Sequence, residues 1–386
     1  MKTNIETTSY WFKIEPYVYV TIAENKALLY NTLDGAHMES YSPNVIKLLS
    51  ELLQKDNYGV ILLTNEKYHN PEIFHFITEL RDKYMGDIIN TSFSQYKPIQ
   101  ILPYYNWGET HELFKKHNFF VGKKILTYLS EISIYFDKET DAEHLILYLQ
   151  SLPEGLKINL IGNIKEISDY NRLLDILNQI PSLKKLICFY DNIIMLPPEY
   201  EKGFSYTILV HLPLDITLWN KSRSYLFNQN FPYEYIFEVS SYFDCQQAYT
   251  FIEKFEIDKY QLKPIYTGDN IDFFRDEVFL SREDILSEKL SIKDIFLNQA
   301  INIYDFGKLN ILPNGDIYAN IHFPALGNIK THSIYDVVLK ELEEGKSWLR
   351  IRNQAPCNNC IFQWLCPSPS DYEITIGRPN LCNVKL

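Results

Sequence analysis

Four of the six cysteines stand close together in the last part of the sequence, at Cys357, Cys360, Cys366 and Cys382. Such a density of thiols is typical of a metal or cluster site, because each thiolate is a strong ligand for zinc or iron. The Cys-x-x-Cys spacing of the first pair lets a turn direct both sulfurs at one centre. Four thiolates suit either a tetrahedral zinc ion or a 4Fe–4S cluster, and the spacing leaves both open.

The other two cysteines have surroundings that favour a structural role. Cys188 lies within an apolar run, and Cys245 stands at the start of a helix-like stretch. Free cysteine is among the most buried residue types and packs as a small apolar side chain. We therefore expect both residues to be structural.

The composition limits the classes of protein to consider. The chain has 386 residues, of which 46% are hydrophobic and 22% charged, a mixture typical of globular proteins that bury a core. Its net charge of -12 argues against binding nucleic acid over a broad surface. No uncharged apolar run approaches the roughly 18 residues of a membrane span, and residues 1–10 hold no secretory signal. We expect a cytoplasmic protein, in which disulfides are disfavoured.

The middle of the chain alternates strand-like and helix-like segments. Short apolar runs stand at 132–136, 157–161, 184–189, 206–212, 233–239 and 260–265. Helix-like stretches, such as 142–149, 170–180 and 246–255, lie between most of them. Six strands that alternate with helices predict an α/β fold with a parallel sheet, either open or closed into a partial barrel. Function in such sheets is found at the carboxyl ends of the strands.

Residues 1–90 are expected to form a separate α+β module. Residues 17–22 and 27–30 predict a hairpin, and residues 58–63 a further strand. Ser42-Pro43 and Asn70-Pro71 each place a capping residue before a proline, which predicts two helix starts. The order strand, strand, helix, strand, helix suggests a winged-helix-like module. We place the three parts of the chain at residues 1–90, 91–304 and 305–386.

The last part combines a hairpin, a helix and the cysteines. Residues 308–312 predict a strand, Pro313-Asn314-Gly315-Asp316 a turn, and residues 317–318 the return. A helix is predicted near 334–344. Together with the four cysteines, this part resembles the SPASM domain of radical S-adenosylmethionine peptide-maturing enzymes. In that family such cysteines hold the second auxiliary 4Fe–4S cluster, and the resemblance implies the same role for the four cysteines here.

The same resemblance points to what is missing. The family's first auxiliary cluster needs cysteines where this chain has Asn320 and Ser370. Its radical centre needs a Cys-x3-Cys-x2-Cys motif after the first barrel strand, but residues 137–144 contain no cysteine. Residues 162–165 replace the Gly-Gly-Glu-like run that holds the cofactor. The resemblance therefore implies a degenerate (β/α)6 partial barrel of radical SAM type that binds no S-adenosylmethionine, in a pseudo-radical-SAM protein.

Asp137, Glu139, Asp141 and Glu143 form an acidic run after the first strand of the predicted sheet. Acidic residues at the N-terminus of a helix are favoured by the helix dipole, which is the simplest interpretation of the run. An ion pair with a partner protein is the alternative.

The resemblance implies an accessory role in peptide maturation. Pseudo-enzymes of this kind occur in Bacteroidales-type systems, beside a competent radical enzyme and a short precursor peptide. The N-terminal module is similar to their peptide-recognition element, in which a precursor leader adds a strand to a sheet edge. We expect a non-catalytic scaffold for a precursor leader, a radical SAM peptide maturase, or both, with one 4Fe–4S cluster and no catalytic residues. The alternatives are an enzyme with a repurposed barrel mouth that uses the cluster as an electron relay, and the same scaffold with a structural zinc.

Overall fold

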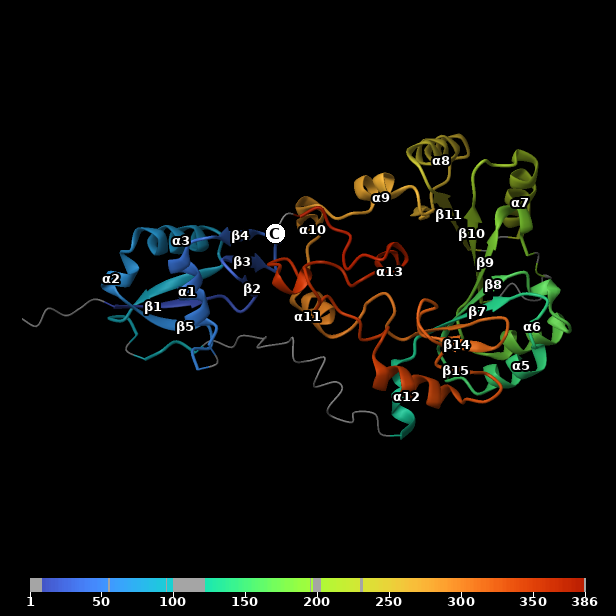
Figure 1. Ribbon diagram of the computed structural model, residues 1–386, viewed down its shortest axis with the longest axis horizontal. Helices are drawn as coiled ribbons and strands as arrows, with labels where there is room; N and C mark the ends of the chain where they lie inside the picture. The colour runs from blue at the N-terminus through green and yellow to red at the C-terminus, as the bar shows by residue number, and fades with distance from the viewer. Residues whose placement is uncertain are drawn as a thin grey trace, which may run out of the picture.

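The computed structural model describes residues 9–54, 56–94, 96–99, 122–194, 196, 203–229 and 232–384. Figure 1 shows an elongated molecule, with a small N-terminal module at one end, a large sheet at the other, and much of the C-terminal segment between them. Within the described part, no helix is long and apolar enough to cross a membrane.

The N-terminal module contains two three-stranded antiparallel sheets, with strand orders β5-β1-β6 and β2-β3-β4. Its elements are β1 (Ser9–Ile14), β2 (Val18–Ala23), β3 (Lys26–Asn31), β4 (His37–Ser40), α1 (Pro43–Leu52), β5 (Val60–Thr64), α2 (Asn65–Tyr68), α3 (Pro71–Asp82) and β6 (Gly86–Asn90). The pairing of β2 with β3 confirms the predicted hairpin. Both predicted helices are also confirmed, because the side chains of Ser42 and Asn70 accept backbone N–H bonds at the starts of α1 and α3.

Three strands of this module lie where the sequence pattern predicts none. They are β1, β4 and β6, and β1 is the central strand between β5 and β6. Phe12 and Ile14 of β1 are fully buried in the core of the module. The winged-helix-like assignment rested on five elements, and it remains a prediction for this larger set.

The middle of the chain contributes to a nine-stranded, mainly parallel sheet, which confirms the α/β fold and the six predicted strands. The six are β7 (Glu131–Phe136), β8 (Lys157–Gly162), β9 (Lys184–Phe189), β10 (Phe204–Val210), β11 (Tyr233–Val239) and β12 (Tyr260–Pro264). Each pairs in parallel with the next. β13 (Lys308–Ile311) pairs in parallel with β7, and β14 (Asp316–Tyr318) and β15 (Gly327–Asn328) continue the sheet as antiparallel strands. The closure of this sheet into a partial barrel stays a prediction.

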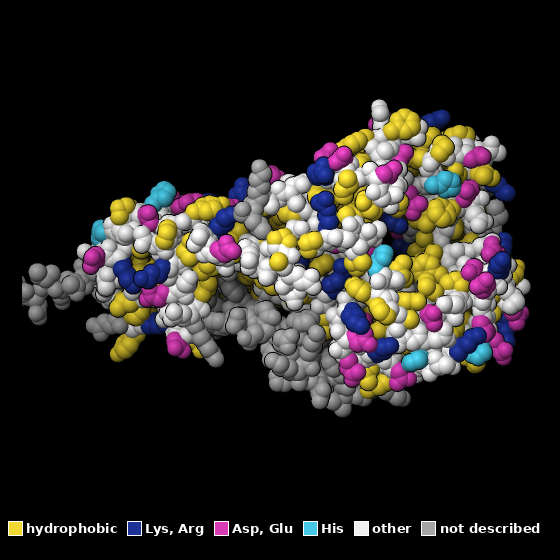
Figure 2. Space-filling view, viewed as in Figure 1, with side chains coloured by type: hydrophobic (Ala, Val, Ile, Leu, Met, Phe, Trp, Pro, Cys, Tyr) yellow, Lys and Arg dark blue, Asp and Glu magenta, His cyan; other side chains and the backbone are white. Residues whose placement is uncertain are grey.

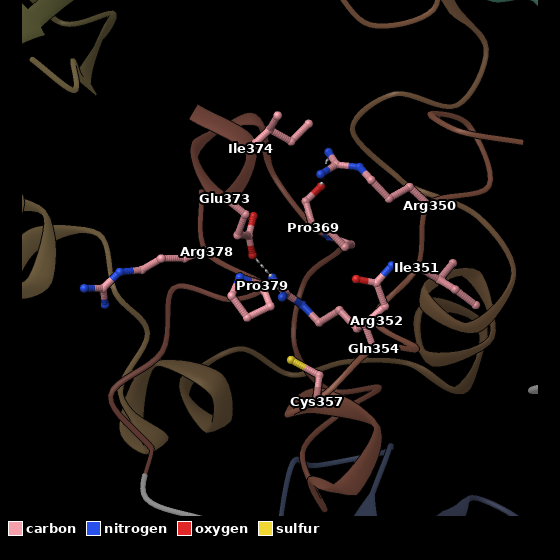
Figure 3. A pocket seen from close by; sticks show the side chains of 10 residues that line it. All are labelled: Arg350, Ile351, Arg352, Gln354, Cys357, Pro369, Glu373, Ile374, Arg378 and Pro379. Carbon is pink, nitrogen blue, oxygen red and sulfur yellow. Dashed lines mark hydrogen bonds and ion pairs between the residues drawn. The ribbon is translucent and has the colours of Figure 1, made fainter. Parts of the chain in front are cut away.

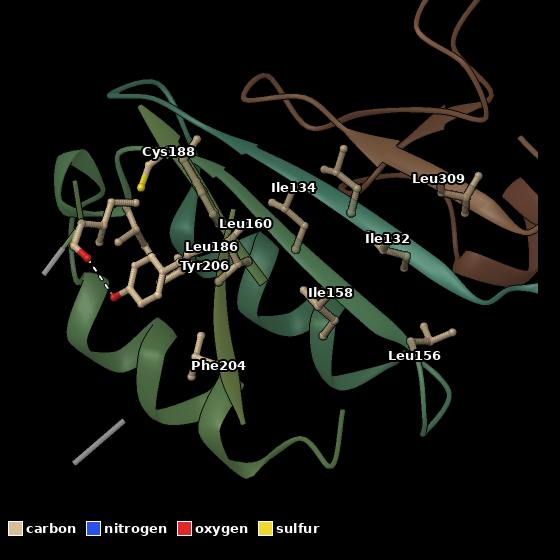
Figure 4. Packing of buried hydrophobic residues seen from close by; sticks show 14 of the residues in the cluster. Ile132, Ile134, Leu156, Ile158, Leu160, Leu186, Cys188, Phe204, Tyr206 and Leu309 are labelled. Carbon is tan, nitrogen blue, oxygen red and sulfur yellow. Dashed lines mark hydrogen bonds between the residues drawn. The ribbon is translucent and has the colours of Figure 1, made fainter. Parts of the chain in front are cut away.

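Helices cover one face of the large sheet (Figure 1). They are α5 (Ala142–Gln150), α6 (Tyr170–Gln179), α7 (Ile216–Gln229) and α8 (Tyr242–Lys254). The 3-10 helices of this part of the chain are η2 (Gly122–Tyr128), which lies beside α12 (Ile334–Glu344), η3 (Ile164–Glu166) and η4 (Tyr190–Asn192). Alternate strand residues such as Ile132 and Ile158 are fully buried and belong to one core (Figure 4). The intervening positions include charged side chains. Lys185 of β9 and Glu234 of β11, on either side of β10, form an ion pair in which Nζ lies 2.7 Å from Oε1.

The C-terminal segment winds back between the large sheet and the N-terminal module (Figure 1). The helices of this region are α9 (Ile271–Glu277), α10 (Arg282–Ser287), α11 (Ile292–Ala300), α12 (Ile334–Glu344), the 3-10 helix η6 (Cys357–Asn359) and α13 (Asp371–Ile376). The predicted helix at 334–344 is confirmed as α12, which begins with a capping box at Ser333 and Asp336. Near the end of the described residues, Leu280 and Cys382 form a parallel bridge. This bridge places Cys382, the fourth cysteine of the sequence motif, next to the start of α10.

Candidate metal centre

The four predicted ligand residues line one small cavity of about 60 Å³. Cys357 begins the 3-10 helix η6, and Cys360 follows its end. Cys366 comes after a short apolar turn. Cys382, the fourth cysteine, is held beside Leu280 by a parallel β-bridge. None of the four is in a disulfide. The fold therefore brings together the residues that the sequence spacing singles out, although Cys382 is distant from the others along the chain.

Backbone N–H groups already point at two of the sulfurs. The N–H of Phe362 donates to Cys360 Sγ at 3.4 Å, and that of Val384 donates to Cys382 Sγ at 3.3 Å. Burial raises the pKa of the Cys366 thiol to about 12. Metal binding at such a thiol requires loss of its proton, so affinity there depends on pH.

The four thiols line one cavity, but they are not grouped closely around a single point. Among the described residues, no three His, Cys, Asp or Glu side chains are placed to hold a metal ion. The donor set of four thiols around one cavity, with N–H donors to two sulfurs, fits a 4Fe–4S cluster or a tetrahedral zinc ion. The two remaining cysteines lie elsewhere: Cys188 is buried in β9 and Cys245 lies in α8.

The apolar turn between the second and third cysteines packs against the N-terminal module. Ile361, Phe362 and Leu365 are buried in one hydrophobic cluster that spans the two parts of the molecule. The other buried members of this cluster are Tyr19, Leu28 and Tyr30 from β2 and β3, and Ile285 and Ile295 from α10 and α11. The N-terminal module therefore covers the apolar turn that carries the cysteine site.

Polar contacts join the same two parts. The hydroxyl of Tyr30 accepts a hydrogen bond from the backbone N–H of Leu290 at 2.9 Å and donates to the carbonyl of Glu288 at 3.3 Å. Arg282 holds Glu39 of β4 through two nitrogens, at 2.7 and 3.0 Å. These contacts fix the orientation of the module against α10 and the start of α11.

Arg352 is the charged residue at the wall of the cysteine cavity. Its Nη2 lies 2.8 Å from Glu373 Oε1, and both side chains are almost fully buried. Figure 3 shows the guanidinium of Arg352 between the carboxylate of Glu373 and the sulfur of Cys357. On its other side Arg352 lines a more open pocket of about 210 Å³, together with Arg350.

Asn320 and Ser370, which stand in place of two family cysteines, take part in a polar network. Asn320 Nδ2 donates to Asp305 Oδ2 at 3.2 Å and to Asp371 Oδ1 at 2.5 Å. Ser347 Oγ also donates to Asp305 Oδ2, at 3.0 Å. Ser370 begins α13 with a capping box. Hydrogen bonds therefore join the β13–β14 hairpin to α13 at these positions.

The connection between β7 and α5 is a short turn stabilised by its own side chains. Asp141 accepts the backbone N–H of His144 at 3.2 Å and so caps α5. Its carboxylate also lies 2.8 Å from Lys330 Nζ, and this contact holds the pKa of Asp141 below its usual range. Asp141 thus caps the helix and Glu143 lies in its first turn, as the simplest interpretation predicted for these two residues of the acidic run, and Asp141 pairs with a cation of the same chain.

Residues 162–165, at the carboxyl end of β8, form a tight turn. Gly162 has a φ of +103°, and a Cβ there would lie 2.5 Å from the carbonyl oxygen of Phe136. Asn163 then caps η3 by accepting the backbone N–H of Lys165 at 3.2 Å. Only glycine fits the first position without strain.

The carboxyl ends of β9 and β10 hold an acid–base pair that the sequence pattern did not reveal. His211 Nε2 lies 3.6 Å from Asp191 Oδ2, and the two side chains are 43% and 34% exposed. The two residues are separated in sequence, and their only signal was that each follows one of two neighbouring strands. At this distance the pair lacks the hydrogen bond of a catalytic dyad.

The face of the molecule in Figure 2 shows Lys and Arg side chains scattered among Asp and Glu over both parts. A hollow with hydrophobic side chains opens in the larger part. On this face the charges form no broad basic surface of the kind that binds nucleic acid.

No protein-family model and no curated protein sequence matches the chain. Among solved structures, the chain is similar to the crystal structure of Streptococcus suis SuiB bound to S-adenosylmethionine, with 13% identity, a TM-score of 0.47, and coverage of 97% of this chain and 99% of that one. It is also similar to native anSMEcpe with bound AdoMet and Cp18Cys peptide, with 9% identity, a TM-score of 0.42, and coverage of 61% and 88%. Likeness at this level does not transfer a function.

Proposed function

We propose that the chain is a non-catalytic accessory protein in the maturation of a ribosomally made peptide, with one 4Fe–4S cluster and no cleavage of S-adenosylmethionine. The observation that carries this proposal is the placement of the thiols. Four cysteines face one cavity in the C-terminal segment, while residues 137–141, at the carboxyl end of the first parallel strand, hold none.

The β7–α5 connection lacks the ligands that radical chemistry requires. A radical SAM centre needs three thiolates there, because they hold the cluster that passes an electron to the sulfonium. This chain instead uses the segment to cap α5, and Asp141 is committed to His144 and Lys330. The turn at 162–165 is likewise occupied by local backbone contacts.

Cys357, Cys360, Cys366 and Cys382 would hold the cluster. When bound, it would supply four thiolate–iron links that order a loop-rich segment, and a centre able to exchange one electron. The chain's own groups do the rest: the N–H groups of Phe362 and Val384 donate to two sulfurs, and the apolar turn excludes water.

The N-terminal module is the part we propose for binding a precursor leader. Within the described residues, β2, β4, β5 and β6 each pair with a strand on one side only. An extended peptide can add a strand to such an edge through main-chain hydrogen bonds. The net charge of -12 suits a basic leader or a basic patch on a radical SAM peptide maturase.

Anaerobic purification followed by iron, sulfide and zinc analysis tests the cluster. We expect about four irons and four sulfides per chain, lost in Cys360→Ala and retained in Cys188→Ala, the matched control. About one zinc without sulfide would overturn the cluster and leave a zinc-containing scaffold.

Incubation of the iron-loaded chain with S-adenosylmethionine and dithionite tests the accessory role. We expect no 5′-deoxyadenosine, and its formation would overturn the non-catalytic assignment. Binding of synthetic precursor leaders to the full chain, measured by fluorescence anisotropy, is expected to be lost when proline is placed at the β4 or β5 edge. Binding that survives both changes would exclude these two edges.

A further inference from the structure

Arg352 occupies an unusual position for a charged residue. Its side chain is 8% exposed and that of Glu373 is 5% exposed. Arg352 lines the cavity that all four cysteines share, and it also lines the open pocket on the other side (Figure 3). Arg352 therefore lies, with Cys357, where the cysteine cavity and the outer pocket meet.

The guanidinium donors reach several segments of the site at once. Nε donates to the carbonyl of Pro367 at 2.5 Å, and Nη2 reaches the carbonyl of Ser368 at 3.4 Å. Both carbonyls directly follow Cys366 in the chain. The guanidinium also lies on the side of the Cys357 sulfur (Figure 3). A planar fork of donors can hold such divergent acceptors, whereas the single ammonium of a lysine cannot.

The backbone of Arg352 is held as well. Gln363, which lies between the second and third cysteines, donates through Nε2 to the Arg352 carbonyl at 2.5 Å. Arg352 thus contacts the segments that carry Cys357 and Cys366 and the turn between them. A residue in this place determines how the ligand-bearing segments sit relative to one another.

Its charge has a second consequence. Four thiolates and a 4Fe–4S core carry a net negative charge, which grows by one on reduction. A buried cation beside the sulfurs favours the more negative state, because the attraction is weakly screened in the protein interior. A carboxylate paired with that cation opposes the effect. Glu373 is such a carboxylate, held at 2.8 Å.

We infer that Arg352 is the positioning residue of the cysteine site and sets its reduction potential, and that the ion pair with Glu373 moderates this charge. The inference rests on the proposed cluster. It predicts opposite signs for two substitutions. Arg352→Gln lowers the reduction potential, and Glu373→Gln raises it, since the neutral amide keeps a hydrogen-bonding oxygen and leaves the guanidinium charge unopposed.

Arg378→Gln is the matched control. Arg378 lines the same outer pocket, but it is exposed and its guanidinium stacks over Phe279, at 5.5 Å from the ring centre. It does not line the cysteine cavity. Removal of this charge should leave the potential at the value of the unchanged chain.

The test is an anaerobic redox titration of the full chain, followed by electron paramagnetic resonance, with iron content measured on each sample. A lowered potential in Arg352→Gln and a raised one in Glu373→Gln support the inference. Shifts of the same sign, or no larger than in Arg378→Gln, overturn it. Where Arg352→Gln holds no iron, Arg352→Lys and Glu373→Gln decide: we expect iron loss in part with Lys and a raised potential with Gln. An unchanged chain without iron would overturn the proposed function itself, whereas iron with unmoved potentials overturns only the role of Arg352.

Discussion

The hydroxyl of Tyr30 is a sensitive point in the contact between the N-terminal module and the cysteine-bearing part. The side chain is 1% exposed, and the hydroxyl bonds to the backbone of both Leu290 and Glu288. Tyr30→Phe removes these two bonds and keeps the ring in its apolar cluster. The backbone N–H of Leu290 then loses this acceptor while the ring still keeps water away.

A buried donor left without its acceptor costs about 1–3 kcal/mol. If this cost falls on the docked state of the module, the equilibrium between closed and open forms shifts about 5- to 150-fold toward opening. Hydrogen exchange followed by mass spectrometry measures this shift. We expect faster exchange in peptides that cover residues 282–300, and unchanged exchange in peptides from β7, β8 and β9.

Tyr17→Phe serves as the control, because the Tyr17 hydroxyl donates to the carbonyl of Tyr84 within the same module. Equal exchange of residues 282–300 in the two variants would refute the reasoning. It would mean that the apolar cluster alone holds the module in place.

Other substitutions test separate features of the C-terminal part. Burial raises the pKa of Glu341 to about 7, so its contribution to stability is present below its ordinary pKa and is lost as pH rises through about 7. Glu341→Gln should therefore remove a pH dependence of the unfolding free energy worth about 3 kcal/mol, measured by denaturant unfolding between about pH 5 and pH 8. An unfolding free energy that depends on pH as in the unchanged chain would contradict this prediction. Asn320→Leu removes a partner of the buried carboxylate of Asp305 and should cost about 1–3 kcal/mol, measured by the same unfolding; a neutral result would show that water replaces the amide. Phe362→Ala empties a buried site and should cost about 3–5 kcal/mol and reduce iron retention during dialysis, whereas full retention would show that the apolar turn does not protect the cysteines.

Local signals explain how much of the fold follows from the sequence. The runs at 184–189 and 233–239 match β9 and β11, because strands of a parallel sheet carry dense apolar residues. The helix at 334–344 was equally clear, since Ser333 and Asp336 form a capping box before an amphipathic stretch.

Long-range pairing explains what the sequence did not reveal. In β1, Tyr10 pairs with Leu63 on one side and with Asn90 on the other. A short strand of this kind is defined by its partners more than by its own residues. The result is a module with two sheets where the pattern indicated a hairpin and one further strand.

The candidate site divides in the same way. Cysteine spacing is a local property, and it identified the four thiols that share the cavity. The pairing of Arg352 with Glu373 depends on the fold of the C-terminal segment, and arginine and glutamate are too common for their positions to stand out. The packing of β2 and β3 against the apolar turn beside the cysteines joins residues far apart in the sequence, so no local motif predicts it.

The contact of β2 and β3 with the C-terminal segment also dictates an order of events during synthesis. Tyr30 meets Leu290, 260 residues later in the chain, and Tyr19 meets Gln299, 280 residues later. At a translation rate of about 5–20 residues per second, Tyr19, Leu28 and Tyr30 stay without their final neighbours for roughly 15–60 s. The nascent module therefore presents an apolar sheet face to the ribosome's surroundings, where a holding chaperone or another copy of the chain can reach it. The apolar turn beside the cysteines is made last, so it meets a sheet face that has already been synthesised.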